Sequence, residues 1–118
     1  MTSDQTIELS TSAIGVGEPV FTIAEMSGNH NGDLSRALEI VDAVATTGAK
    51  ALKIQTYTAD TLTIDSDRPS FRVKGDHGLW GGRNLYSLYR EAHTPWEWHR
   101  EIDRKSTRLN SSHLVISY

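Results

Sequence analysis

Two apolar runs, VFTIAE at residues 20–25 and ALKIQTY at residues 51–57, decide the fold. Nearly continuous apolar runs of this length are typical of strands buried in a parallel sheet. Between them, LSRALEIVDAVA at residues 34–45 repeats apolar residues at helical spacing. Asp33 suits the N-cap of that helix, and Gly48 suits the left-handed position after its end. Strand, helix and strand with short connections predict a βαβ unit, hence a parallel sheet with a right-handed crossover.

The segment before this unit predicts a short hairpin. TIELS at residues 6–10 alternates apolar and polar side chains, as a half-exposed strand does. GVGEP at residues 15–19 has the composition of a turn. We therefore expect an N-terminal hairpin that turns near residues 15–19.

The segment after this unit predicts a long loop and two helices. Residues 60–83 contain four glycines and read as a loop, and long loops after parallel strands often hold substrates. Residues 84–93 have a helical pattern. TPWE at residues 94–97 matches a capping box with proline at the first helical position, so a second helix should begin there. We expect this helix to end near Ile102, where the apolar pattern stops.

Glu25 is the first candidate for chemistry. A charged residue at the end of a buried apolar strand is unusual, and the carboxyl ends of strands line the active site of a parallel barrel. A carboxylate that caps a helix or pairs with a lysine is an equally good interpretation of the pattern.

Lys53 and Gln55 are the second candidates. Side chains alternate along a strand, so Lys53, Gln55 and Tyr57 should share one face. A lysine in an apolar strand must be paired or must face a polar cavity, where it suits a phosphate or carboxylate. The alternative is an edge strand with one wet face.

The loop NHNG at residues 29–32 and the aromatic residues give weaker signals. A lone His30 between asparagines and before a glycine is more typical of a turn than of a metal site. Aromatic side chains at helical spacing favour a core role for Tyr89 and Trp96. Trp80 could belong to the core or stack on a sugar.

Composition excludes several classes of protein. The 118 residues include no cysteine, which rules out disulfides and cysteine zinc sites. The net charge of −3 is spread with mixed sign, so we expect no nucleic acid partner and no membrane-binding face. With neither a signal peptide at the start nor an apolar stretch long enough to span a bilayer, a cytoplasmic location is the expectation.

Several motifs together resemble the sialic acid synthase family. They are AEMSGNHNG at 24–32, LKIQTY at 52–57, LW at 79–80, LY at 85–86 and TPWEWH at 94–99. They occur in order over about residues 20–101. The AEMSGNH variant resembles the pseudaminic acid synthase branch more than the N-acetylneuraminate synthase branch, which remains the alternative.

The resemblance implies an α/β fold, namely the N-terminal portion of a TIM (β/α)8 barrel. It implies condensation of phosphoenolpyruvate with an N-acetylated amino sugar, with Glu25 as the catalytic acid/base or orienting residue. Lys53 would bind phosphoenolpyruvate and Gln55 the sugar. The full-length family uses a divalent metal, manganese or magnesium, as a Lewis acid, and forms homodimers.

The metal ligands of the family lie on later strands. The histidines of this chain that follow the βαβ unit match no such site; they are His77, His93, His99 and His113. We therefore expect no metal ligand in this chain.

The last residues set the expected domain boundary. DRKSTRLNSSH at residues 103–113 has the polar composition expected of no barrel element and resembles the translation of a sequencing adapter. Residues 1–102 should therefore be the first part of a synthase barrel, inactive alone, and residues 103–118 a non-native tail. The competing hypotheses are a small sugar- or phosphate-binding module and an aldolase with Lys53 as Schiff-base nucleophile; the ordered motifs disfavour the aldolase.

Overall fold

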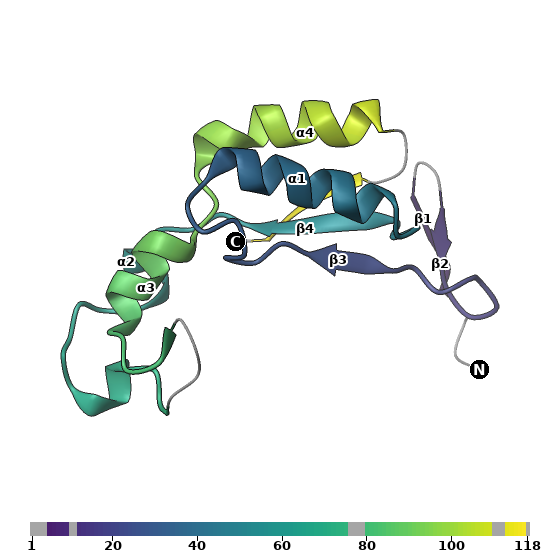
Figure 1. The fold of residues 1–118 in the computed structure, drawn as a ribbon. Helices are drawn as coiled ribbons and strands as arrows, with labels where there is room; N and C mark the ends of the chain where they lie inside the picture. Colours follow the sequence, from purple (N-terminus) through teal and green to yellow (C-terminus); the bar gives the residue numbers. More distant parts are fainter. Residues whose placement is uncertain (1–4, 10–11, 76–79, 110–112, 118) are drawn as a thin grey trace.

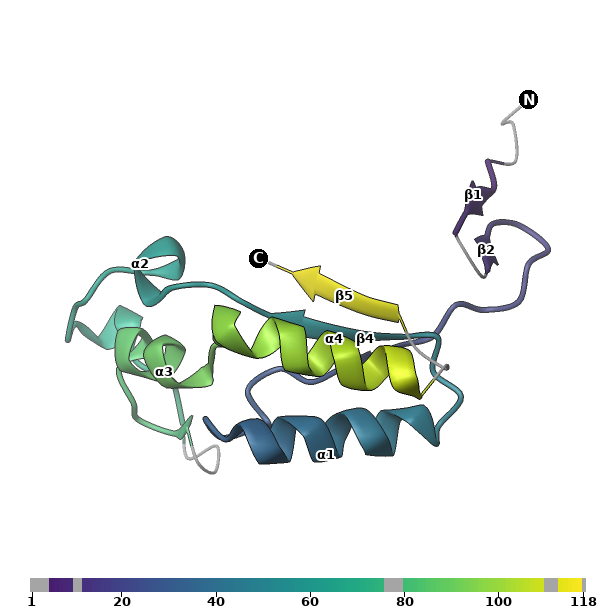
Figure 2. The same cartoon turned by 90° about the horizontal axis from the view of Figure 1, so that it is seen from above.

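A parallel three-stranded sheet forms the centre of the molecule. The computed structural model describes residues 5–9, 12–75, 80–109 and 113–117. The strands are β3 (Ile23–Glu25), β4 (Ala51–Gln55) and β5 (His113–Ser117), with β4 in the middle. Helix α1 (Leu34–Ala45) joins β3 to β4, and α4 (His99–Arg108) precedes β5. Both helices lie over the same face of the sheet (Figures 1 and 2). The predicted α/β class and the parallel βαβ unit are confirmed.

Helix α1 forms where the sequence predicts it. The Asp33 carboxylate accepts the backbone N–H of Ser35 at 2.8 Å, which satisfies a donor that the first turn leaves without a partner. Ala37 and Val41, four residues apart, are buried on one face. Gly48 has φ +78°, a left-handed conformation that glycine adopts without steric cost.

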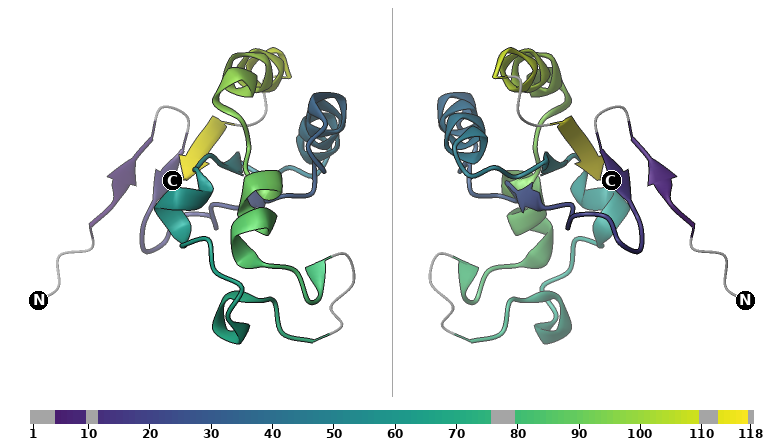
Figure 3. Two further views of the ribbon diagram at one scale, coloured as in Figure 1. Left: turned by 90° about the vertical axis from the view of Figure 1, so that its left-hand side faces the viewer. Right: turned by 90° about the vertical axis from the view of Figure 1, so that its right-hand side faces the viewer.

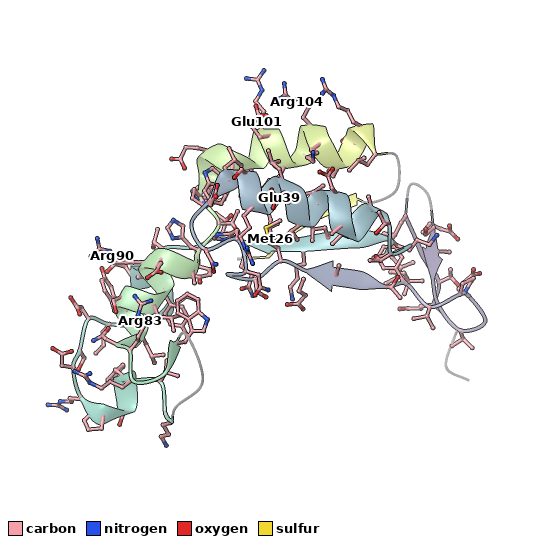
Figure 4. The ribbon with its side chains drawn as sticks, in the orientation of Figure 1. Met26, Glu39, Arg83, Arg90, Glu101 and Arg104 are labelled. Atoms are coloured by element: carbon pink, nitrogen blue, oxygen red, sulfur yellow. The ribbon has the colours of Figure 1, made fainter. Side chains whose placement is uncertain are left out.

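The hydrophobic core fills the layer between the helices and the sheet. It comprises Met26, Ala37, Val41, Leu52, Ile54 and Ile102. Ala24, Leu38, Ile40, Val44 and Trp98 pack around it. Figure 4 shows Met26 between α1 and the sheet, whereas Glu101 and Arg104 project from α4 away from it.

A hairpin stands at the amino end of the sheet, apart from the helical layer (Figure 3). Its strands β1 (Ile7–Glu8) and β2 (Ala13–Ile14) pair antiparallel, which confirms the hairpin. The N–H of Leu9 donates to the carbonyl of Ser12 at 2.7 Å, so the chain reverses between these two residues. The prediction that residues 15–19 form the hairpin turn is wrong; they form a separate turn after β2.

An excursion at the carboxyl end of β4 connects it to α4 (Figure 1). It contains α2 (Ala59–Leu62), the 3-10 turn η1 (Pro69–Phe71), α3 (Leu85–Ala92) and the 3-10 turn η3 (Trp96–Trp98). Helix α3 confirms the predicted helix, and Asn84 caps it by accepting the N–H of Tyr86 at 2.8 Å.

The predicted capping box is absent from this structure. The α-helical turns begin at His99 after the 3-10 turn, and Pro95 precedes them with no side-chain cap. The hydroxyl of Thr94 lies instead 3.4 Å from His30 Nε2, and both residues are fully buried.

Helix α4 continues past Ile102 to Arg108, so the expected end near Ile102 is wrong. Ile102 and Ser106 lie one turn apart and are both buried. Lys105 forms an ion pair with Asp42 of α1 at 2.9 Å. The polar residues that seemed to end the helix lie largely on its outer face. Beyond it, β5 pairs in parallel with all of β4, so residues 103–108 and residue 113 do belong to a helix and a strand.

The molecule is extended for its size. Its radius of gyration is 17.2 Å, against about 13.5 Å for a compact domain of this length. The first predicted strand, expected to be buried, is confined to residues 23–25, and Ile23 is 49% exposed. The reason is that β3 is an edge strand, and no layer of the described residues covers the second face of the sheet. No helix within the described residues has the length and apolar character to cross a membrane.

Candidate functional site

Glu25 and Lys53 meet across two neighbouring strands. In the parallel register Glu25 lies opposite Lys53, so both side chains leave the same face of the sheet. Lys53 Nζ donates to Glu25 Oε1 at 2.7 Å. The interpretation of Glu25 as the partner of a lysine is therefore realised, and that lysine is itself a candidate site residue.

Gln55 follows two residues after Lys53 on the same face of β4. Leu52 and Ile54 point the other way and are buried beneath the helices. The face that carries Glu25, Lys53 and Gln55 is thus the open one. The alternative that Lys53 belongs to an edge strand is wrong, because β4 lies between β3 and β5.

The ion pair adds little to stability. The side chains of Lys53 and Glu25 keep 28% and 52% of their surface exposed. Exposed pairs of this kind contribute about 0–1 kcal/mol. The pair therefore offers a cation and a carboxylate to a ligand more than it stabilises the fold. A lysine ammonium can bind a phosphate or carboxylate, a glutamate can transfer a proton, and a glutamine amide can both donate and accept hydrogen bonds.

The carboxyl end of β4 is fixed by Thr94, a residue that the sequence analysis used only as a helix cap. Its N–H donates to the carbonyl of Gln55 at 2.7 Å, and its own carbonyl accepts the hydroxyl of Thr56 at 2.7 Å. These contacts join residues 38 or 39 positions apart, and no local pattern announces them.

Aromatic rings lie next to one another just after the carboxyl end of β4. Tyr57 packs edge-on against Tyr89 with ring centroids 5.8 Å apart, and His93 lies 6.1 Å away. Burial, and to a smaller extent Tyr89, raises the pKa of the Tyr57 hydroxyl. The alternation along residues 53, 55 and 57 was the sequence signal that predicted Tyr57 on the same face as Lys53 and Gln55.

His30 participates in a turn, as expected. The ring is fully buried, and Nδ1 accepts the backbone N–H of Gly32 at 3.0 Å. Its edge meets Trp98 at 5.1 Å between centroids. Desolvation lowers the pKa of His30, and the nearby His93 lowers it further.

The predictions for the aromatic residues have different outcomes. Trp96 is 54% exposed, so its assignment to the core is wrong, whereas Trp98 packs on the core. Tyr89 is half-buried against Tyr57. Trp80 lies beneath the Arg83 guanidinium, 5.4 Å from the ring centroid.

The described residues do not supply a metal centre. Among residues 5–9, 12–75, 80–109 and 113–117, no three His, Cys, Asp or Glu side chains cluster as metal ligands would. His99 Nε2 lies 2.5 Å from the Thr56 hydroxyl, and His93 Nδ1 lies 2.8 Å from the Arg90 carbonyl. His77 falls outside the described residues.

Known proteins resemble this chain over most of its length. Pseudaminic acid synthase of Campylobacter jejuni is 54% identical over 83 residues, which are 70% of this chain and 24% of that protein. Pseudaminic acid synthase of Helicobacter pylori is 41% identical over 93 residues, covering 79% of this chain and 27% of that protein. The chain thus spans about a quarter of the length of these relatives.

A solved structure agrees with the sequence relatives. The N-acetylneuraminic acid (sialic acid) synthetase of Leptospira borgpetersenii superposes with a TM-score of 0.71 at 25% identity, covering 98% of this chain and 35% of that one. The NeuB family matches residues 40–114, which include Lys53 and Gln55 but begin after Glu25. Since that match spans more than half of its 118 residues, the chain belongs to the NeuB family, as the sequence motifs had indicated.

Proposed function

We propose that this chain is the N-terminal part of a nonulosonic acid synthase that condenses phosphoenolpyruvate with an N-acetylated amino sugar, in the manner of a pseudaminic acid synthase. The observation that carries the proposal is the juxtaposition of Glu25, Lys53 and Gln55 on the open face at the carboxyl ends of parallel strands. The relatives named pseudaminic acid synthase support this branch. N-acetylneuraminate synthesis is the alternative.

The sheet supports a barrel as the complete fold. The strands β3 and β4 are parallel neighbours joined by α1, and α1 and α4 lie over one face of the sheet. In a (β/α)8 barrel the helices form the outer ring and the other face of the sheet lines the interior. Such barrels need about 250 residues. This chain would therefore supply the first strands, and the rest of a longer synthase would supply the others.

In the proposed reaction, C3 of phosphoenolpyruvate forms a bond to the aldehyde carbon of the open-chain sugar. Water then adds to C2, and the C–O bond to phosphate breaks. Lys53 would bind the phosphate or carboxylate of phosphoenolpyruvate as a point charge. A bound anion would compete with Glu25 for the Lys53 ammonium group. Glu25 would then be free to accept or return a proton, while Gln55 would hold the sugar.

The remaining expectations stay proposals. A divalent manganese or magnesium ion would act as Lewis acid on the aldehyde. The described residues of this chain do not fit that ion, so no step above depends on it. We also propose a homodimer for the complete protein and a location in the cytoplasm.

A chimera tests the proposed function. Residues 20–102 would replace the matching segment of the Campylobacter jejuni pseudaminic acid synthase, and phosphate release would be measured with phosphoenolpyruvate and the amino sugar. We expect an active chimera in which Lys53→Ala lowers kcat/KM for phosphoenolpyruvate by about 100-fold, or about 2.7 kcal/mol.

Lys50→Ala is the matched control, because Lys50 is exposed at the other end of β4. It should leave kcat/KM within about twofold. A folded chimera in which Lys53→Ala and Lys50→Ala behave alike would rule out the role of Lys53.

A binding experiment on the isolated chain distinguishes a barrel fragment from a small binding module. A module that uses Lys53 and Gln55 should bind phosphoenolpyruvate by itself, and a barrel fragment should not bind it measurably. Calorimetric titration of the purified chain distinguishes the two.

We also propose that residues 1–102 are the native part and that residues 103–118 are non-native. Their adapter-like sequence supports this boundary, although the family match extends to residue 114 and residues 103–108 complete α4. Sequencing the source locus across Ile102 and Asp103 tests it. A reading frame that leaves DRKSTRLNSSH and continues into further strand–helix repeats is the expected result, and an unchanged frame would refute the boundary.

A further inference from the structure

Four buried or half-buried polar residues lie behind the site and form one chain of contacts. Thr94 Oγ1 lies 3.4 Å from His30 Nε2, and Thr94 O accepts the hydroxyl of Thr56 at 2.7 Å. Thr56 Oγ1 in turn lies 2.5 Å from His99 Nε2. His30, Thr94 and Thr56 have no exposed surface. These contacts link four segments: the loop after β3, the segment before η3, the end of β4 and the start of α4.

The contacts fix which hydrogens the histidines carry. His30 Nδ1 accepts the Gly32 N–H, so in the neutral ring the proton is on Nε2, which faces Thr94. A protonated His30 would place two N–H donors against each other. The hydroxyl proton of Thr56 goes to the Thr94 carbonyl, so His99 Nε2 is the donor to Thr56 Oγ1.

The chain of contacts is coupled to the ends of both strands that carry the site. The Thr94 N–H binds the Gln55 carbonyl at 2.7 Å, and the Met26 N–H binds the Lys53 carbonyl at 3.0 Å. His30 lies in the loop that leaves Glu25 through Met26. A Cβ on Gly28 would lie 3.0 Å from the Ala92 side chain, so this loop also packs tightly against the end of α3.

We propose that His30, Thr94, Thr56 and His99 are positioning residues that clamp the carboxyl ends of β3 and β4 together and so hold Glu25 over Lys53 and beside Gln55. The clamp requires His30 to be neutral. The charged and titratable groups around it are Asp33 and Arg36 beside the His30 loop, His93 at the end of α3 and Glu97 beside His99. The meaning of the clamp for catalysis rests on the function proposed above, whereas its geometry does not.

Amide hydrogen exchange of the 118-residue chain tests the clamp with two conservative variants. His30→Asn keeps an acceptor near Gly32 but cannot reach Thr94, and Thr94→Val removes the hydroxyl while keeping the backbone groups. Each variant should speed exchange of the amides at positions 26 and 94 about tenfold and leave the Ile54 amide within about twofold, because only the local opening changes. Thr61→Val, the same substitution at an exposed helix position, is the control and should change none of them.

A histidine side-chain ¹⁵N spectrum gives the second measurement. The His30 ring should show the Nε2–H tautomer and become protonated only at a lower pH than the histidine of a free peptide. Three results would overturn the clamp: equal acceleration at positions 26, 54 and 94, which marks a merely structural role; no acceleration; or a His30 ring that titrates as in a free peptide. None of these measurements involves phosphoenolpyruvate, so failure of the clamp and failure of the proposed function are distinguishable.

Discussion

The two faces of β4 differ in how far the described residues complete them. Leu52 and Ile54 point toward α1 and α4 and are fully or almost fully buried. Lys53 and Gln55, the intervening residues, remain partly exposed on a face that no described layer covers. One five-residue strand thus carries a packed core on one side and an uncovered surface on the other. The difference assigns stability to the first face and leaves the second available for the chemistry proposed above.

The uncovered surface limits the stability expected of the isolated chain. The molecule exposes 8144 Å², against about 6,400 Å² for a compact protein of this mass. Exposed apolar side chains concentrate on the N-terminal part, with Val16, Val20 and Ile23 among them. Because the buried apolar area must offset the entropy of ordering the chain, we expect marginal stability and a tendency to aggregate. A cooperative thermal transition with a midpoint above about 45 °C, as in an ordinary stable domain, would contradict this expectation.

The largest expected effect comes from the covered face. Ile54 has no exposed surface and packs in the core. Ile54→Ala should cost about 3 kcal/mol, because it removes buried methyl groups and leaves a cavity. In a chain of low stability this change is enough to unfold most molecules. Circular dichroism with urea at low temperature measures the loss.

The matched change on the open face is Ile23→Ala. Ile23 is 49% exposed on the edge strand β3, so the substitution should cost about 1 kcal/mol or less. Equal losses for the two variants would mean that the open face is covered in solution, for example by a second copy of the chain.

Lowering the pH should also destabilise the fold, through the histidines His30 and His99. Burial lowers the pKa values of His30 and His99 from 6.5, and His93 lowers that of His30 further. The unfolded chain therefore binds protons more readily than the folded one, and stability is lost as the pH falls below about 6.5. Each unit of depression corresponds to about 1.4 kcal/mol once the pH is below both values.

Urea unfolding at pH 7.5, 6.5 and 5.5 measures this loss. His30→Asn should flatten the dependence, because it removes a group that must stay neutral in the fold. A dependence unchanged by this variant would assign the acid sensitivity to other groups.

Local patterns were sufficient for the elements that pack by periodicity. The spacing of apolar residues located α1, the Asp33 cap and β4, and the alternation along β4 placed Lys53 and Gln55 on one face. The same rules misjudged α4, because only Ile102 and Ser106 of this helix are fully buried while most of its polar residues lie on the outer surface. The polar residues after Ile102 were interpreted as the end of the helix, but most of those up to Arg108 lie on the outer face of α4.

Long-range contacts were beyond such patterns. Thr94 reads as a helix cap in isolation, and only the fold brings it to His30, 64 residues away. Likewise Trp96 and Trp98 have similar local contexts, and the position of α4 decides that Trp98 is the one that packs. The pairing of Glu25 with Lys53 depends on strand register, which the sequence left open.

The smallest expected effect is the one that separates chemistry from stability on the open face. In a double-mutant cycle, Glu25→Gln and Lys53→Met should each change the free energy of unfolding by about 1 kcal/mol or less, since exposed ion pairs contribute little. The coupling between them should be about 0.5 kcal/mol and should shrink in 1 M salt, where charges are screened. A coupling of several kcal/mol would mean that the pair is desolvated already, as in a covered site. A small one supports the view that β4 gains its stability from Leu52 and Ile54 and leaves Glu25 and Lys53 available to a ligand.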